Sequence, residues 1–494
     1  MIDLTVNESG VECAARRARQ RRIVIPTFAQ MKDPSLAPDG IKERLRRVGL
    51  WDLDPLNLFR ITWKNEPVGA GGFGQVNTVE FPGSLTGVEA RVIALVGKWF
   101  PTGSHKVGAT FGCLVPRLVT GQFDPTRDKA VWPSTGNYCR GGAYVANLLG
   151  CDSIAILPQG MSAERFEWLS KVAGEVIATP GSESNVKEVF DATWDLKRTR
   201  EDVVVFNQFD DFGNYLWHYE VTGHAMEEAL ERLLGPQDRY CGLVLTTGSA
   251  GTIACGDYLK QIFPTSIIAA GEALQCPTLL ENGFGDHRIE GIGDKHVPWI
   301  HHVRNTDMVM SLDDAVVVKL ARLFNERAGR RYLAARGVGT RKGPFRVPED
   351  LDLLGFSGIA NLSMAVKFAK YYELGEHDVI LTVLSDSMAL YQSRLHAMSQ
   401  QYGEYTERDA AADHARYLLG LTTDHLVELR YTDRRRIHNL KYFTWVEQRG
   451  KTTEEIMAQW YAPDYWTAIQ RQAAEIDALI EEFNGRVGLS REIS

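Results

Sequence analysis

The chain has 494 residues, which suits two packed lobes with extensions better than three independent domains. Its hydrophobic fraction of 44% can form a full core, and its formal net charge of -8 offers no basic surface for DNA or RNA. No uninterrupted apolar stretch is long enough to span a bilayer. We therefore expect neither a nucleic-acid partner nor a membrane association.

Short β-branched segments alternate with amphipathic segments from about residue 91 onward. This alternation is typical of repeated β-α units and predicts an α/β fold with mostly parallel sheets. The predicted strands are residues 92–96, 153–157, 175–178, 203–206, 242–245, 266–270 and 378–383. Residues 453–483 have helical spacing of apolar side chains, including Ile456, Ile469 and Ile480. Because so long an apolar face must be covered, we expect it to lie on the body or to help form a homodimer.

The cysteines occur singly, with no C-x-x-C pair and no histidines at the spacing of metal ligands. This pattern predicts a reduced protein without a bound metal, and a cytoplasmic location suits it best.

A lysine lies in the segment P-T-G-S-H-K-V-G, between an apolar strand and a helix. Lys106 would stand at the base of a cleft above the strand ends, where partial burial disfavours its charged form. A neutral amine can form an imine with a carbonyl cofactor. Taken alone, a lysine after a Gly-Ser turn is more often a solvated residue.

The segment S-T-G-N follows a strand-like run and precedes a helix. Its backbone N–H groups and the hydroxyls of Ser134 and Thr135 could bind a substrate carboxylate, and the amide of Asn137 could meet a ring hydroxyl. Helix capping by Ser134 or Thr135 is the alternative explanation.

The segment T-T-G-S-A-G-T follows the strand predicted at residues 242–245. Small residues let the backbone wrap around a phosphate, and the hydroxyls of Ser249 and Thr252 with the following helix dipole would complete such a site. A strand-to-helix turn without a ligand explains this loop equally well when it is considered alone.

In this order, the three segments resemble the fold type II pyridoxal-phosphate enzymes, which include cysteine synthase, cystathionine β-synthase, threonine dehydratase and the tryptophan synthase β subunit. The resemblance extends over residues 54–395. Further segments resemble the cysteine-synthase branch: Q-F at 208–209 with Asn214, G-I-G at 291–293, and L-S-D-S at 384–387.

The resemblance implies that pyridoxal 5'-phosphate is the cofactor, held as a Schiff base on Lys106, with Asn137 at its ring hydroxyl. The residues implied to hold the phosphate are Gly248, Ser249, Ala250, Gly251 and Thr252. Those implied to bind the substrate carboxylate are Ser134, Thr135, Gly136 and Gln208.

The pyridine nitrogen of these enzymes faces a neutral hydroxyl, for which Ser357 is our first choice and Ser385 our second. A neutral partner leaves the nitrogen unprotonated and favours β-elimination. His105, which precedes the lysine, resembles tryptophan synthase more than cysteine synthase and is expected to reach the cofactor phosphate.

The resemblance also implies a domain division. Residues 51–136 and 207–400 would form a large cofactor-binding domain, and residues 137–206 a small mobile domain that closes over the substrate and excludes water. Residues 1–50 and 401–494 would be extensions.

The expected reaction is β-elimination of an activated serine or cysteine derivative, followed by release of a keto acid or by addition of a nucleophile, with Lys106 as general base. The pattern Asn137-x-x-Arg140-Gly141 favours an alternative, a threonine or serine dehydratase or a diaminopropionate ammonia-lyase. A non-catalytic homologue is a third possibility, which the presence of Lys106 disfavours. The only partner expected besides a second copy is a small amino acid.

Overall fold

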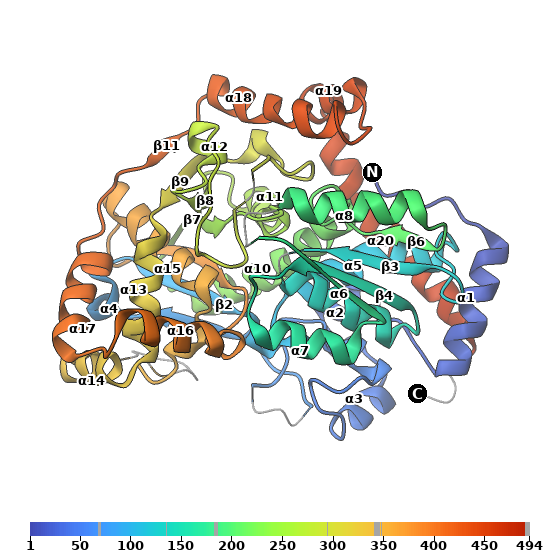
Figure 1. Ribbon diagram of the computed structural model, residues 1–494, viewed down its shortest axis with the longest axis horizontal. Coiled ribbons are helices and arrows are strands. Elements are labelled where there is room, and N and C mark those ends of the chain that lie inside the picture. Colours follow the sequence, from blue (N-terminus) through green and yellow to red (C-terminus); the bar gives the residue numbers. More distant parts are fainter. Residues whose placement is uncertain are drawn as a thin grey trace.

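The computed structural model describes residues 1–67, 71–134, 136–181, 186–293, 295–339, 346 and 348–489. Two β-sheets, in different halves of the molecule in Figure 1, organise these residues. The larger sheet has the strand order β1 (Thr78–Phe81), β2 (Arg91–Val96), β10 (Asp378–Leu384), β7 (Arg239–Thr246), β8 (Ile267–Ala273), β9 (Met308–Leu312) and β11 (Leu426–Glu428). Its inner strands run parallel, and only β1 and β11 are antiparallel to their neighbours among the described residues.

The smaller sheet is parallel throughout, with the order β5 (Glu175–Thr179), β4 (Asp152–Pro158), β3 (Lys129–Pro133) and β6 (Val203–Val205). It begins at residue 129, before the start at residue 137 that was expected for the small domain. The α/β class with mostly parallel sheets is confirmed. The four-part domain division itself stays a prediction.

Each of the seven predicted strands overlaps an observed strand. The predicted set lacks β1, β3, β9 and β11. β1 and β11 are short antiparallel edge strands, and β9 has the sequence M-V-M-S-L, in which two methionines weaken the β-branched signal. Such strands depend on pairing with neighbours that are distant in sequence.

Helices cover both sheets (Figure 1). In the N-terminal half they are α1 (Glu8–Arg21), α2 (Phe28–Lys32), α3 (Asp39–Leu45), α4 (Gly83–Thr86), α5 (Lys106–Val119), α6 (Asn137–Leu148), α7 (Ala163–Val172), α8 (Val186–Thr199), α9 (Phe212–Trp217) and α10 (Gly223–Leu233). The later ones are α11 (Ala254–Ile262), α12 (Thr278–Glu281), α13 (Asp314–Asn325), α14 (Arg327–Ala335), α15 (Phe356–Tyr371), α16 (Gln392–Tyr402), α17 (Glu407–His414), α18 (Tyr431–Lys441), α19 (Thr453–Tyr461) and α20 (Tyr465–Val487). α15 packs on the larger sheet, whereas α6, α7 and α8 pack on the smaller one.

The C-terminal helix α20 covers the body of its own chain. It lies beside α1 (Figure 1) and also packs on α2, α5 and α9. Its apolar side chains Ile469, Ile476, Ile480 and Phe483 are buried. The expectation that this face lies on the body is correct, and the face therefore gives no support for a homodimer.

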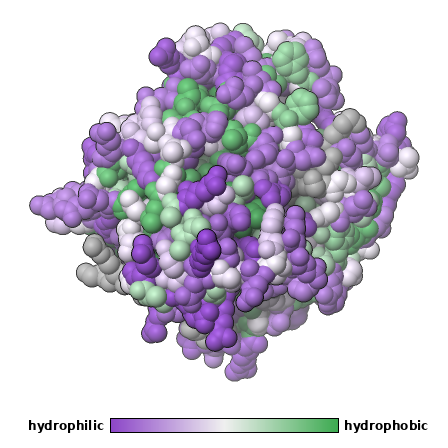
Figure 2. Space-filling model, turned by 60° about the vertical axis from the view of Figure 1, so that its left-hand side comes forward, coloured by the Kyte–Doolittle hydropathy of each residue, from purple (hydrophilic) through white to green (hydrophobic). Residues whose placement is uncertain are grey.

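Hydrophilic residues cover most of the face shown in Figure 2, with hydrophobic side chains in small groups among them, as is usual on protein surfaces. Within the described residues, no helix combines the length and the apolar character that crossing a membrane requires.

Candidate active site

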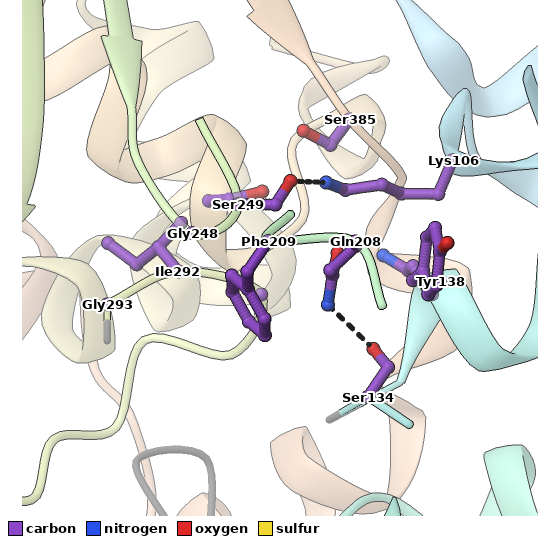
Figure 3. Close-up of a pocket in the computed structure, with 13 residues that line it drawn as sticks. Lys106, Ser134, Tyr138, Gln208, Phe209, Gly248, Ser249, Ile292, Gly293 and Ser385 are labelled. Carbon is purple, nitrogen blue, oxygen red and sulfur yellow. Dashed lines mark hydrogen bonds between the residues drawn. The ribbon is translucent and has the colours of Figure 1, made fainter. Parts of the chain in front are cut away.

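Three neighbouring parallel strands bring the predicted segments together. β2, β10 and β7 lie side by side, so their carboxyl ends share one edge of the larger sheet. Lys106 follows β2 after two short 3-10 turns, Ser385 directly follows β10, and Gly248 follows β7. These residues line one pocket (Figure 3).

Eight of the predicted site residues line this pocket: Lys106, Ser134, Asn137, Gln208, Gly248, Ser249, Ser357 and Ser385. Ala250, Gly251 and Thr252 belong to the same loop as Ser249 but do not line the pocket in the described structure, and neither do His105 and Gly136. Thr135 lies outside the described residues.

Ser249 is held at the centre of the predicted phosphate site. Its hydroxyl oxygen accepts hydrogen bonds from Lys106 Nζ at 3.2 Å (Figure 3) and from Asn214 Nδ2 at 3.0 Å. Because both partners donate, the hydroxyl hydrogen of Ser249 is left to donate to an anion. The loop then continues into a 3-10 turn. Its first hydrogen bond runs from Ile253 N to Ala250 O at 3.2 Å, so the N–H groups of Gly251 and Thr252, which come before it, have no partner within the turn. Such a set of donors fits a phosphate.

The loop that was expected to bind a carboxylate is also preorganised. Gln208 Nε2 donates to Ser134 Oγ at 3.4 Å (Figure 3), and Gly136 N donates to the same oxygen at 3.2 Å. A Cβ atom on Gly136 would come within 2.3 Å of Nη1 of Arg165, which is 1% exposed. The buried arginine thus supports this loop from behind and requires glycine at that position.

Asn137 is fixed by a buried acid. Its Nδ2 donates to Asp386 Oδ2, and the hydroxyl of Tyr391 donates to the same oxygen at 2.5 Å. Burial raises the pKa of the Asp386 carboxyl, against the effect of these two hydrogen bonds and of the nearby Arg165. Oδ1 of Asn137 is buried without a partner in the described structure, so it is available to a bound ring.

Ser357 and Ser385 both line the pocket, the first near the start of α15 and the second after β10. Their shared position leaves the choice of partner for the pyridine nitrogen open.

His105 precedes Lys106 but does not line the pocket. Its ring is fully buried, stacked on Trp63 at 5.6 Å and edge-on to His218 at 5.0 Å. Because His105 precedes α5 by one residue, its side chain leaves the helix axis in a different direction from that of Lys106. Both ring nitrogens of His105 are buried without a hydrogen-bond partner among the described residues, and the expected contact with a cofactor phosphate stays a prediction.

Acid should destabilise the fold through buried histidines around the site. Burial lowers the pKa of His105 and His218 well below the ordinary value, and burial beside Arg449 lowers the pKa of His296 to about 3. The unfolded chain binds protons at these residues below about pH 6.5 and the folded chain does not, so their contribution to stability is complete above that pH and is lost as the pH falls.

From pH 7 to pH 5.5 we expect the free energy of unfolding, measured in urea, to fall by about 4 kcal/mol through these three groups. The variant His218→Gln should show a shallower fall over the same interval. Equal stability of the unmodified protein at both pH values would contradict this assignment.

Other residues at the site escaped the sequence analysis. Tyr138, Phe209, Gly291, Ile292 and Gly293 line the pocket as well. Four of them lie inside segments that carried the family resemblance, but the sequence analysis assigned these residues no role. Asn214 and Asp386 also lay in such segments, but their contacts with Ser249 and Asn137 join residues far apart in sequence.

Comparison with known proteins agrees with this geometry. Residues 98–333 match the family model described as pyridoxal-phosphate dependent enzyme. The chain is 26% identical to cystathionine β-synthase of Saccharomyces cerevisiae over 62% of its own length and 58% of that protein. It is 27% identical to a cysteine synthase of Staphylococcus aureus over 59% of its length and 84% of that protein. An O-acetylserine dependent cystathionine β-synthase from Helicobacter pylori has the same fold, with a TM-score of 0.52 and 22% identity over 64% of this chain and 94% of that one.

Residues 98–333 therefore form a domain of the pyridoxal-phosphate dependent enzyme family, and the chain is similar to cysteine synthase and cystathionine β-synthase within the fold type II class. Pyridoxal phosphate is its cofactor, and the residues present fit it. Lys106 can hold it covalently, the loop at Ser249 offers the donors for its phosphate, and Asn137 faces the space for its ring.

Proposed function

We propose that the enzyme catalyses β-replacement or β-elimination on a small amino acid, an activated serine or cysteine derivative. The observation that carries the proposal is one pocket in which Lys106, the phosphate loop at Ser249 and the carboxylate-binding pair Ser134 and Gln208 meet. The similarity to cysteine synthase supports the same reaction class.

When bound, pyridoxal phosphate supplies an electron sink for charge that develops at the substrate α-carbon. Ser134 and Gln208 bind the substrate carboxylate and so fix the direction of the α-C–H bond. Lys106 Nζ, which already lies within hydrogen-bond distance of Ser249, removes the α-proton as general base, and the β-substituent then leaves. Asn137, which Asp386 holds in place, would orient the cofactor ring relative to Lys106.

We also propose that residues 137–206 form a small domain that closes over the substrate. Two contacts support a closed arrangement, in which α7 of the smaller sheet meets the segment after β10. Arg165 Nη2 donates to the Tyr391 hydroxyl at 2.9 Å, and Ser393 N donates to Glu164 Oε1 at 2.7 Å. Closure would exclude water from the reacting carbon.

The dehydratase or ammonia-lyase alternative loses its supporting residue. Arg140 is 3% exposed and does not line the pocket; its guanidinium lies 4.9 Å from the Trp168 ring and 5.4 Å from the Trp51 ring. Of that pattern, Asn137 lines the pocket, whereas Arg140 packs against two tryptophan rings and does not line it.

A cytoplasmic location and a homodimer complete the proposal. None of the seven cysteines forms a disulfide, which suits a reducing compartment. The homodimer was expected from the apolar face of residues 453–483; because α20 packs on its own chain, that face no longer supports it and the homodimer stays a prediction.

Product analysis of the cofactor-loaded enzyme tests the proposed reaction. With O-acetyl-L-serine and sulfide, we expect cysteine; without sulfide, we expect pyruvate and ammonia at a lower rate. L-Threonine, L-serine and 2,3-diaminopropionate serve as controls and should react at least about tenfold more slowly, because their β-substituents leave less readily. Faster release of ammonia from one of these controls, with no thiol requirement, would support the dehydratase or ammonia-lyase class instead.

A further inference from the structure

A second pocket, with a volume of about 200 Å³, lies close to the catalytic pocket. Ser134 and Gln208 line the catalytic pocket, whereas their neighbours Pro133 and Asn207 line the second pocket. Consecutive residues of the same two chain segments therefore line the two pockets.

The second pocket is predominantly cationic. Four basic and two acidic side chains line it: Arg117, Lys197, Arg449, Lys451, Asp210 and Asp211. Arg117 pairs with Asp211 at 3.2 Å, and Lys451 with Asp210 at 3.5 Å. Within the part of the chain that the structure describes, Lys197 and Arg449 form no ion pair. An excess of two positive charges thus faces this pocket.

Aromatic rings hold the two unpaired cations in place. The guanidinium of Arg449 lies 4.2 Å from the Phe190 ring and 5.4 Å from the Trp194 ring, and Lys197 Nζ lies 5.3 Å from the Trp194 ring. Nε of Arg449 is buried and has no hydrogen-bond partner among the described residues. A buried donor without a partner is costly, and an anionic ligand would satisfy it.

The partition between the pockets consists of aromatic side chains. Phe209, which lies between Ile292 and Gln208 in Figure 3, lines the catalytic pocket, and its ring is 5.9 Å from that of Phe190 on the other side. His296 lies 4.9 Å from Phe209. Phe209 and Phe190 are buried, so a ligand that reaches from one pocket into the other requires these side chains to change rotamer.

We propose that the second pocket binds a carboxylate or phosphate group carried by the β-substituent, either on the leaving group of the first substrate or on the incoming nucleophile. This inference rests on the proposed function and names its substrate class. Trp445, Arg449 and Lys451 of the second pocket lie outside the family match at residues 98–333. The C-terminal extension therefore supplies the charge selectivity.

Two matched pairs of substrates test the proposal and separate the two sources of the anion. O-Succinyl-L-serine and O-acetyl-L-serine, each with 2-mercaptoethanol, differ by one carboxylate on the leaving group. Mercaptoacetate and 2-mercaptoethanol, each with O-acetyl-L-serine, differ by one carboxylate on the nucleophile. In one of these pairs we expect kcat/KM for the anionic member to exceed that of the neutral member at least about tenfold, the effect of one charge-assisted hydrogen bond.

In the variant Arg449→Gln, the ratio of kcat/KM for the anionic member to that for the neutral member should fall at least about tenfold, while the rate with the neutral member stays unchanged. Lys197→Gln, at a partly solvent-exposed helix position, provides a second variant should Arg449→Gln fold poorly. Arg198→Gln is the control, because Arg198 is the next residue on α8 and pairs with Asp195 outside the pocket. An absent preference in both pairs, or one that Arg449→Gln and Lys197→Gln leave unchanged, would overturn the proposal.

If no pair turns over, the proposed reaction has failed and the pocket is tested by binding alone. Calorimetric titration of the cofactor-loaded protein with succinate should then show affinity that Arg449→Gln weakens at least about tenfold. Succinate binding that is absent, or equal in the two proteins, would overturn the inference independently of the reaction.

Discussion

Replacement of Lys106 by alanine is expected to abolish covalent retention of the cofactor and to lower turnover by roughly a hundredfold to ten-thousandfold, the range for loss of a general base. Lys106 Nζ is the amine that reaches Ser249 in the pocket, and no shorter side chain can replace it there. After borohydride reduction and tryptic digestion, mass spectrometry of the unmodified protein should find the cofactor on the peptide that contains Lys106.

Lys98→Ala is the matched control for this experiment. Lys98 is close in sequence but pairs with Asp352 and does not line the pocket, so its loss should leave the labelled peptide unchanged. A label on any lysine other than Lys106 would contradict the assignment.

Substitution of Gly251 by alanine is expected to weaken cofactor binding by about thirtyfold, the effect of losing one or two hydrogen bonds. A Cβ atom at this position would lie 2.2 Å from Asn214 Oδ1, so the asparagine must move. Asn214 then can no longer hold Ser249, whose hydroxyl is placed to bind the phosphate. Titration of the cofactor-free protein, followed by absorbance, measures the change in affinity.

Gly375→Ala serves as the control because a Cβ atom there meets nothing within 4 Å. Its cofactor affinity should equal that of the unmodified protein. Unchanged affinity in Gly251→Ala would show that Asn214 and Ser249 do not hold the phosphate as the site geometry requires.

The sequence predicted which residues line the pocket where the local segment alone determines their position. Lys106, Asn137 and Ser249 each follow a strand and precede or begin a helix, and parallel strands bring such segments to one edge. The direction of a side chain is harder to predict for a residue that merely neighbours such a position in the sequence. His105 was assigned to the cofactor because it precedes Lys106; its ring is buried and stacks on Trp63, and its contact with the phosphate stays a prediction.

Roles that depend on tertiary contacts could not be read from the sequence. Asp386 fixes Asn137 from a strand end that is more than two hundred residues later in the chain. The apolar spacing of α20 showed that the helix must be covered but gave no information on whether the cover is its own chain or a second copy. The cationic pocket combines α8 with the C-terminal extension, so it exists only in the folded protein.

Release of acetate from O-acetyl-L-serine, compared between the cofactor-loaded enzyme and Lys106→Ala, tests the central claim most directly. The claim is that Lys106 removes the α-proton and thereby allows the β-substituent to leave. We predict acetate release by the unmodified enzyme and a rate in Lys106→Ala that is lower by at least about a hundredfold. Equal rates in the two proteins, or no release by an enzyme that has bound its cofactor, would contradict the account.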